Sequence, residues 1–300
     1  MKKKTYLFAL MAMVLTLGSC SDNENGIGGE TSKYITVSTS IGNMTRVATD
    51  AKGGQTFEEG DEISVYAWIG APTVAPETSE RVVNNAINKL TNGTWVSTPQ
   101  MLWKNNREKH YFIGVYPTAA ISDLSAGEYT FDVNKQTESD LLVAVNPDGL
   151  SYSADAQQTV PLTFTHVMAK LAVNLTYKNQ WGGIPTVEKV VVGNAAKEAT
   201  INYLTKVVTP STTAKEDFSL PEITENTKYV SVIIPQEDVK QLTIVIGGKN
   251  FVYDNGTPFK LESGKITTVN LEVGRDEIKL GDVKITNWED GSTFSGEALN

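Results

Sequence analysis

Residues 34–41 read Tyr-Ile-Thr-Val-Ser-Thr-Ser-Ile, and this short stretch decides the class of fold. Apolar or β-branched residues fall on every second position, and small hydroxyl residues lie between them. A period of two is typical of a β-strand with one face toward a core and the other toward water. The face that we expect to be buried carries Ile35, Val37, Thr39 and Ile41.

Strand-like runs of this kind recur along the rest of the chain. They are Glu62–Ile69, His110–Tyr116, Tyr129–Val133, Leu141–Val145, Leu171–Tyr177, Val187–Val192, Tyr229–Ile234, Leu242–Ile246, Phe251–Tyr253 and Ile266–Val273. Gly, Pro, Asn and Asp punctuate them, and Asp254-Asn255-Gly256 is typical of a tight hairpin turn. Helical periodicity is scarce, with Ser79–Leu90 as the best candidate. Many short strands with frequent turns predict an all-β sandwich or barrel.

The chain is long enough for two domains. Its 300 residues exceed the roughly 100–200 residues of one typical domain. A polar stretch at residues 151–159 separates two strand-rich halves. We therefore predict an N-terminal domain over residues 34–157 and a C-terminal domain over residues 158–300.

The first twenty residues have the layout of an export signal. Lys2–Lys4 precede an apolar run, Tyr6–Leu17, which is too short to span a bilayer as a helix. The run ends in Leu-Gly-Ser before Cys20, which resembles a bacterial lipobox. We predict a lipoprotein signal peptide at residues 1–19, lipidation of Cys20 and a flexible tether at residues 20–33. The alternative is a plain secretory leader with an incidental Cys.

Charge and composition exclude several classes of function. The chain has 26 Lys and Arg against 35 Asp and Glu, and loss of Lys2–Lys4 leaves 23 against 35, a charge of −12. Without basic clusters such a chain is a poor match for nucleic acid, where cations must neutralise phosphates. A single Cys excludes an intramolecular disulfide framework, and two His leave little for a metal site. We expect no cofactor, no metal and no nucleic-acid partner.

No catalytic motif accompanies the titratable side chains. His110 and His166 could each act as a general base, but neither has a Ser or Cys nucleophile motif nearby in the sequence. A hydrogen-bonded core histidine is the favoured interpretation of both. Five Trp could stack on sugars, although in a β protein they are more often anchors of cores and domain junctions. We therefore predict that the chain is not an enzyme.

An ordered set of segments resembles the fimbrillin-like lipoproteins, the subunits of type V fimbriae. The resemblance rests on order and spacing over essentially the whole mature chain. After the lipobox the segments are Ile35–Val37, Met44–Val47, Phe57–Tyr66, Trp95, Trp103, Phe112–Pro117, Leu162–Leu171, Ile233–Gln236 and Ile285–Trp288.

The resemblance implies a fold and an assembly route. Members of this family are two tandem transthyretin-like β-sandwich domains, exported as lipoproteins to the surface of the outer membrane. In stalk-forming members an Arg-specific protease frees the first strand, and the vacated groove accepts a strand from a neighbouring subunit. Anchor and tip members share the fold but depart from this cycle.

Carried onto this chain, the resemblance makes the strand with Ile35, Val37, Thr39 and Ile41 the one that is displaced. It places the cleavage between Arg46 and Val47, in a polar segment that ends in two glycines. The alternative is that Arg46 is an ordinary solvated loop residue. Weaker candidates for cleavage are Arg81, Arg107 and Arg275.

The donated strand is expected near the C-terminus. Ile278 with Leu280, and Val283 with Ile285, form two pairs of period two on either side of Gly281. A replacement strand of this kind restores the ladder and buries alternate side chains. The alternative is an ordinary closing strand of the second sandwich.

Together these features predict a structural subunit of a cell-surface fimbria that supports adhesion. Its expected partners are other fimbrial subunits, an Arg-specific protease and, through the lipid on Cys20, the outer membrane. Two alternatives stay open: an anchor or tip accessory protein that does not polymerise, and a surface lipoprotein that binds glycans through Trp.

Overall fold

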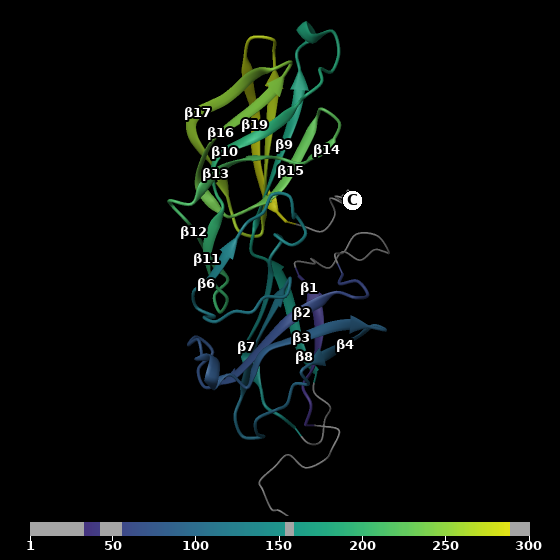
Figure 1. Cartoon of the computed structure of the whole chain (residues 1–300), viewed down its shortest axis with the longest axis vertical. Coiled ribbons are helices and arrows are strands. Elements are labelled where there is room, and N and C mark those ends of the chain that lie inside the picture. Colours follow the sequence, from purple (N-terminus) through teal and green to yellow (C-terminus); the bar gives the residue numbers. More distant parts are fainter. Residues whose placement is uncertain (1–32, 43–55, 154–158, 289–300) are drawn as a thin grey trace, which may run out of the picture.

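The structure, a computed structural model, describes residues 33–42, 56–153 and 159–288. Strands dominate these residues, and the helical segments among them are two 3-10 turns, η1 (Thr78–Glu80) and η2 (Asn179–Trp181). None of the described helices is long and apolar enough to cross a membrane. The structure therefore confirms the all-β class, while the transthyretin-like detail stays a prediction. Figure 1 shows two β-rich halves that lie end to end.

The N-terminal half is one seven-stranded sheet. Its spatial order is β1-β8-β7-β5-β2-β3-β4, and every pairing is antiparallel except that of β1 with β8. The strands are β1 (Thr36–Ile41), β2 (Glu62–Ile69), β3 (Val83–Thr91), β4 (Thr94–Thr98), β5 (His110–Tyr116), β7 (Leu142–Leu150) and β8 (Thr159–His166). Because the first strand in the sequence lies at one end of this order, it is an edge strand.

The seven-stranded sheet curls around its own core. Buried side chains from all seven strands form one hydrophobic cluster, the small core, which includes Val37 of β1, Val65 of β2, Trp95 of β4 and Leu162 of β8. The two edge strands approach each other, since the Trp95 indole Nε1 donates to the Thr39 hydroxyl at 3.0 Å. The curl places β1 over the open side of the small core.

The C-terminal half is a sandwich of two sheets around a larger core. The four-stranded sheet has the order β13-β10-β16-β17 and the five-stranded sheet the order β14-β15-β9-β18-β19. The strands are β9 (Ala169–Tyr177), β10 (Lys189–Ala196), β13 (Lys215–Ser219), β14 (Glu222–Thr224), β15 (Lys228–Ile233), β16 (Gln236–Ile246), β17 (Lys249–Leu261), β18 (Lys265–Val273) and β19 (Ile278–Asn287).

The two halves share this larger core. Tyr66 and Trp68 on β2 point away from the small core and join the cluster that contains Leu171 and Val269 of the sandwich. Burial on both faces explains why every residue of β2 from Ile63 to Trp68 is buried, whereas a strand with one exposed face buries every second residue. A three-stranded sheet also links the halves, because β6 (Gly127–Thr130) pairs with β11 (Glu198–Asn202), which pairs with β12 (Val207–Pro210).

Two local predictions were wrong. Ser79–Leu90 is not a helix: apart from η1 its residues lead into and form β3. Asp254–Gly256 is not a hairpin turn, since β17 runs through it as an irregularity opposite Val239 and Gln241. The hairpin is instead made by Gly247 and Gly248, both at positive φ, between the paired Ile246 and Lys249.

Sheet membership changes just after the predicted domain boundary. β8 begins at Thr159 but pairs with β1 and β7 of the N-terminal sheet, whereas β9 from Ala169 onward belongs to the sandwich. The pairing of β6 with β11 also joins strands from the two sides of the predicted boundary. The division at residues 157 and 158 stays a prediction.

Candidate functional site

The first strand is held along one side by β8. Six parallel pairs run from Thr36 with Thr159 to Ile41 with Phe164, and among the described residues no other strand pairs with β1. Ile35 is 2% exposed and Val37 6% exposed, while Thr39 and Ile41 are half-buried. The side chains that the sequence placed on the inner face thus point into the small core.

A second contact fastens the beginning of this strand. The Ile35 amide donates to the Met101 carbonyl at 3.0 Å, and the Trp103 amide donates to the Lys33 carbonyl at 3.1 Å. Tyr34 and Leu102 form an isolated antiparallel bridge between these bonds. Residues 33–35 therefore pair with residues 101–103, which we call the clamp segment, directly before the ladder of β1 with β8 begins at Thr36.

The strand covers apolar side chains of its neighbour. In the parallel register, Val37 lies beside Val160, and the next inner positions of β1 lie beside Leu162 and Phe164. These three β8 residues are at most 1% exposed. Without β1, the backbone groups on that side of β8 lose their partners and the small core is open to water.

The predicted donor segment forms β19, which lies at an open edge of the sandwich. β19 pairs with β18 from Ile278 with Val273 to Asn287 with Lys265, and the register shifts at Gly281. That shift brings all four predicted residues onto one side, next to the core-facing residues of β18. Yet Leu280, Val283 and Ile285 are 36–40% exposed, and Ile278 is half-buried.

In this structure β19 therefore closes the second sandwich, as the alternative interpretation of this segment expected. Its apolar row is on the core side, but the opposing sheet covers it only in part. The role as a donated strand stays a prediction. Cys20, Arg46 and Val47 lie outside the described residues.

The weaker cleavage candidates differ in access. Arg81 is 8% exposed, and its guanidinium donates to the carbonyls of Ile121 and Ser122, both at 2.6 Å. Those bonds fix Arg81 as a structural residue that a protease cannot reach in the folded chain. Arg107 and Arg275 are exposed.

Both histidines are held by hydrogen bonds. His110 is fully buried: its Nε2 accepts from the Lys104 amide at 3.1 Å, and its Nδ1 lies 3.2 Å from the Glu108 carbonyl. Burial lowers the pKa of His110 below its usual 6.5. His166 Nδ1 lies 2.8 Å from the Asp140 carboxylate. Neither arrangement presents a nucleophile, in keeping with the interpretation of both as core residues.

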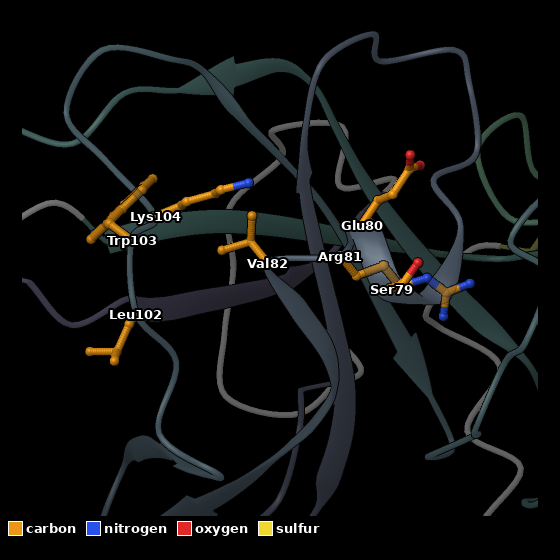
Figure 2. Close-up of a pocket in the computed structure, with 7 residues that line it drawn as sticks. All are labelled: Ser79, Glu80, Arg81, Val82, Leu102, Trp103 and Lys104. Carbon is orange, nitrogen blue, oxygen red and sulfur yellow. The ribbon is translucent and has the colours of Figure 1, made fainter.

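Neither of the two pockets described below brings reactive side chains together. One shallow pocket of about 330 Å³ lies between η1 and the clamp segment. Figure 2 shows the charged ends of Glu80, Arg81 and Lys104 pointing in different directions, so no polar site converges there. A second, of about 370 Å³, lies at the far end of the sandwich beside Tyr177 and Ile184. Within the described ranges, no group of three or more His, Cys, Asp or Glu could hold a metal ion.

The tryptophans are mostly inside. Trp68, Trp95, Trp103 and Trp288 are at most 9% exposed, and Trp181 is half-buried. Stacking on a sugar needs an accessible ring face. The geometry therefore favours core and junction anchors over a glycan platform.

Two features of the sheet edges were not predicted from the sequence. Sequence reasoning did not find the clamp segment, because a bridge between residues 34 and 102 leaves no local pattern. It also gave no role of its own to Trp288, although an aromatic residue directly after a period-two run is a usable signal for a strand end that is fixed by burial.

Solved structures share this fold at low identity. A candidate cell adhesion protein from Bacteroides uniformis is 18% identical, with a TM-score of 0.61 over 85% of this chain and 99% of its own. A second, from Bacteroides ovatus, is 17% identical, with a TM-score of 0.63 over 86% and 99%. A fimbrial protein from Bacteroides vulgatus is 12% identical, with a TM-score of 0.51 over 84% and 99%.

No curated protein matches the sequence. The model of one protein family, described as fimbrillin-like, matches residues 45–288. That range begins just after β1 and ends at Trp288, so it takes in most of both halves. The chain therefore belongs to the fimbrillin-like family.

Proposed function

We propose that this chain is a structural subunit of a cell-surface fimbria that is assembled by strand exchange. Membership of the fimbrillin-like family supports a fimbrial role, structural or accessory, at the cell surface. The observation that carries the finer proposal is the position of β1. It is an edge strand, yet its inner side chains complete the small core.

The exchange begins with a cut between Arg46 and Val47. The cut separates β1 covalently from the strands that follow, and the strand is then held by the β8 ladder, the clamp segment, side-chain burial and the Trp95–Thr39 hydrogen bond. Burial of Ile35 and Val37 contributes about 3–6 kcal/mol, at ~1.5–3 kcal/mol for each side chain. A donated strand with similar inner residues recovers this burial and the ladder bonds, so exchange is close to balanced.

The donated strand in this proposal is β19. Its apolar row of Ile278, Leu280, Val283 and Ile285 has the period of a strand once the shift at Gly281 is taken into account. Exposed apolar side chains gain by moving into the small core of a neighbour. Each subunit then gives one edge strand and receives another, which builds a polymer.

Export and anchoring precede assembly. Acyl chains on Cys20 hold the newly exported chain at the outer membrane, and the cut after Arg46 releases it for polymerisation. A chain that keeps β1 stays anchored and serves as an accessory subunit. The single chain with β1 and β19 docked is the starting point of both roles, and the cut after Arg46 separates the two roles.

Treatment of the leaderless protein with an Arg-specific protease tests the proposal. The expected products start at Val47 and form a ladder of oligomers on an unboiled gel. The variant Arg46→Lys should give neither product, because the protease requires Arg. The control Arg107→Lys, at an exposed site in the same half, should behave like the parent chain.

Two results would overturn the stalk role. One is a ladder that forms equally well from Arg46→Lys. The other is complete cutting after Arg46 that yields monomers with the first strand still bound.

A further inference from the structure

β19 is a long strand with little burial of its own. After Ile278, every residue of the strand is exposed. Its pairing with β18 is interrupted at Gly281, and its outer edge pairs with no strand in the described part of the chain. Such a strand, covered only in part on its core side and exposed on the other, frays readily unless something fixes one of its ends.

The residue directly after the strand is buried instead. Trp288 is 5% exposed, and its backbone amide donates to the Gly264 carbonyl at 2.9 Å. Its ring stacks on the His166 imidazole, with centroids 4.0 Å apart and planes 7° apart. The Lys170 ammonium lies 4.0 Å from the centroid of the same ring. A buried cation and an aromatic stack both favour this position of the indole.

The ring partners belong to two different sheets. His166 is the last residue of β8 in the N-terminal sheet, while Lys170 is on β9 in the sandwich. Two residues before His166, the Phe164 carbonyl accepts from the Gly42 amide at 2.8 Å, directly after β1. Trp288 thus ties the end of β19 to the strand on which β1 lies.

We propose that Trp288 is the positioning residue that anchors β19 in its own sandwich. The indole must leave His166 and Lys170 before β19 can separate from β18. That the freed strand enters a neighbour rests on the proposed function, whereas the anchor itself does not. Because the anchor rests on β8, a change in β8 when β1 leaves reaches β19 through a direct contact.

Hydrogen–deuterium exchange on the unassembled leaderless protein tests the anchor. The amides of β19 that bond to β18 should lose protection about tenfold or more in Trp288→Ala, while those of β15 and β16 keep theirs. His166→Phe retains a ring under the indole and should stay close to the parent chain. Phe218→Ala is the matched control, because it removes another buried aromatic ring of the same half, on β13, which does not pair with β18 or β19.

Each result decides the proposal. A selective loss in β19 supports the anchor. Unchanged protection of β19 in Trp288→Ala overturns it, and so does an equal loss in all strands, which would make Trp288 an ordinary core residue. If Trp288→Ala fails to fold, the milder Lys170→Met is measured against the same criterion. None of these outcomes depends on polymer formation, so failure of the anchor and failure of strand exchange are distinguishable.

Discussion

At the residue scale, His110 should make the N-terminal half sensitive to acid. Its Nε2 accepts a hydrogen bond from the Lys104 amide, so the folded chain needs the neutral imidazole. Because burial lowers the pKa of His110 from 6.5, the unfolded chain binds more protons than the folded chain below that pH. We expect the free energy of unfolding to fall as the pH drops below about 6.5.

Urea denaturation at several pH values measures this effect. In His110→Gln the position no longer titrates, so the fall in stability toward acid pH should be shallower than in the parent chain. The same slope in both proteins would contradict the role given to His110. His166 is present in both chains and cancels from the comparison.

The inner face of β1 gives a second prediction at this scale. Ile35→Ala should lower the free energy of unfolding by about 2–5 kcal/mol, because the side chain is 2% exposed in the small core. Ser38→Ala, on the exposed face of the same strand, should change it by less than about 0.5 kcal/mol. Equal effects in the two variants would mean that β1 does not complete the core.

The same residues show which features of the fold could be predicted from the sequence. The alternation from Ile35 to Ile41 was enough to place Ile35 and Val37 on a buried face, because a two-residue period is a local property. The clamp segment was beyond reach, since the pairing of Tyr34 with Leu102 joins residues that are far apart in the sequence.

At the scale of elements, bulges account for the failures of periodicity. Val65 pairs with Ala86 and Ala67 with Val83, so β3 has one residue more than β2 between these pairs. Asn85, at φ 56°, lies in this β-bulge. The inserted residue changes the spacing of the apolar positions from two to three, which imitates a helix. By contrast, neither β2 nor β5 contains an inserted residue, and the predicted bounds of both strands match the observed ones.

β19 yields the prediction for this scale. Val283 is 39% exposed in the single chain, so Val283→Lys should change the free energy of unfolding by only about 0.5–1 kcal/mol. In a donated strand the same position is buried, and a charge there should abolish the oligomer ladder. The control Lys284→Ser changes the neighbouring residue on the other face and should leave the ladder intact. A normal ladder from Val283→Lys would exclude β19 as the donor in this register.

At the scale of the whole molecule, the two halves should unfold together. Tyr66 and Trp68 of the N-terminal sheet share a core with the sandwich, and the pairing of β6 with β11 joins strands from both halves. Calorimetry should show a single transition whose calorimetric and van't Hoff enthalpies agree. Two separate transitions would mean that the halves are independent.

The shared core also explains why the organisation in two halves was harder to predict than the strands. Composition places a polar break near residue 155, but sheet membership depends on which strands pair. β8 follows the break and still completes the N-terminal sheet, because Val160, Leu162 and Phe164 fit the small core. Pairing partners of this kind are not encoded within a window of neighbouring residues.

Strand exchange requires that the first strand leaves its own subunit when subunits assemble. Mass spectrometry of the oligomers, after separation from monomer and released peptides, measures this directly. We predict that every subunit within the oligomer starts at Val47 and that no peptide containing residues 34–41 accompanies it. Oligomers in which residues 34–41 are still present, either as part of each subunit or as a bound peptide, would contradict strand exchange at this edge.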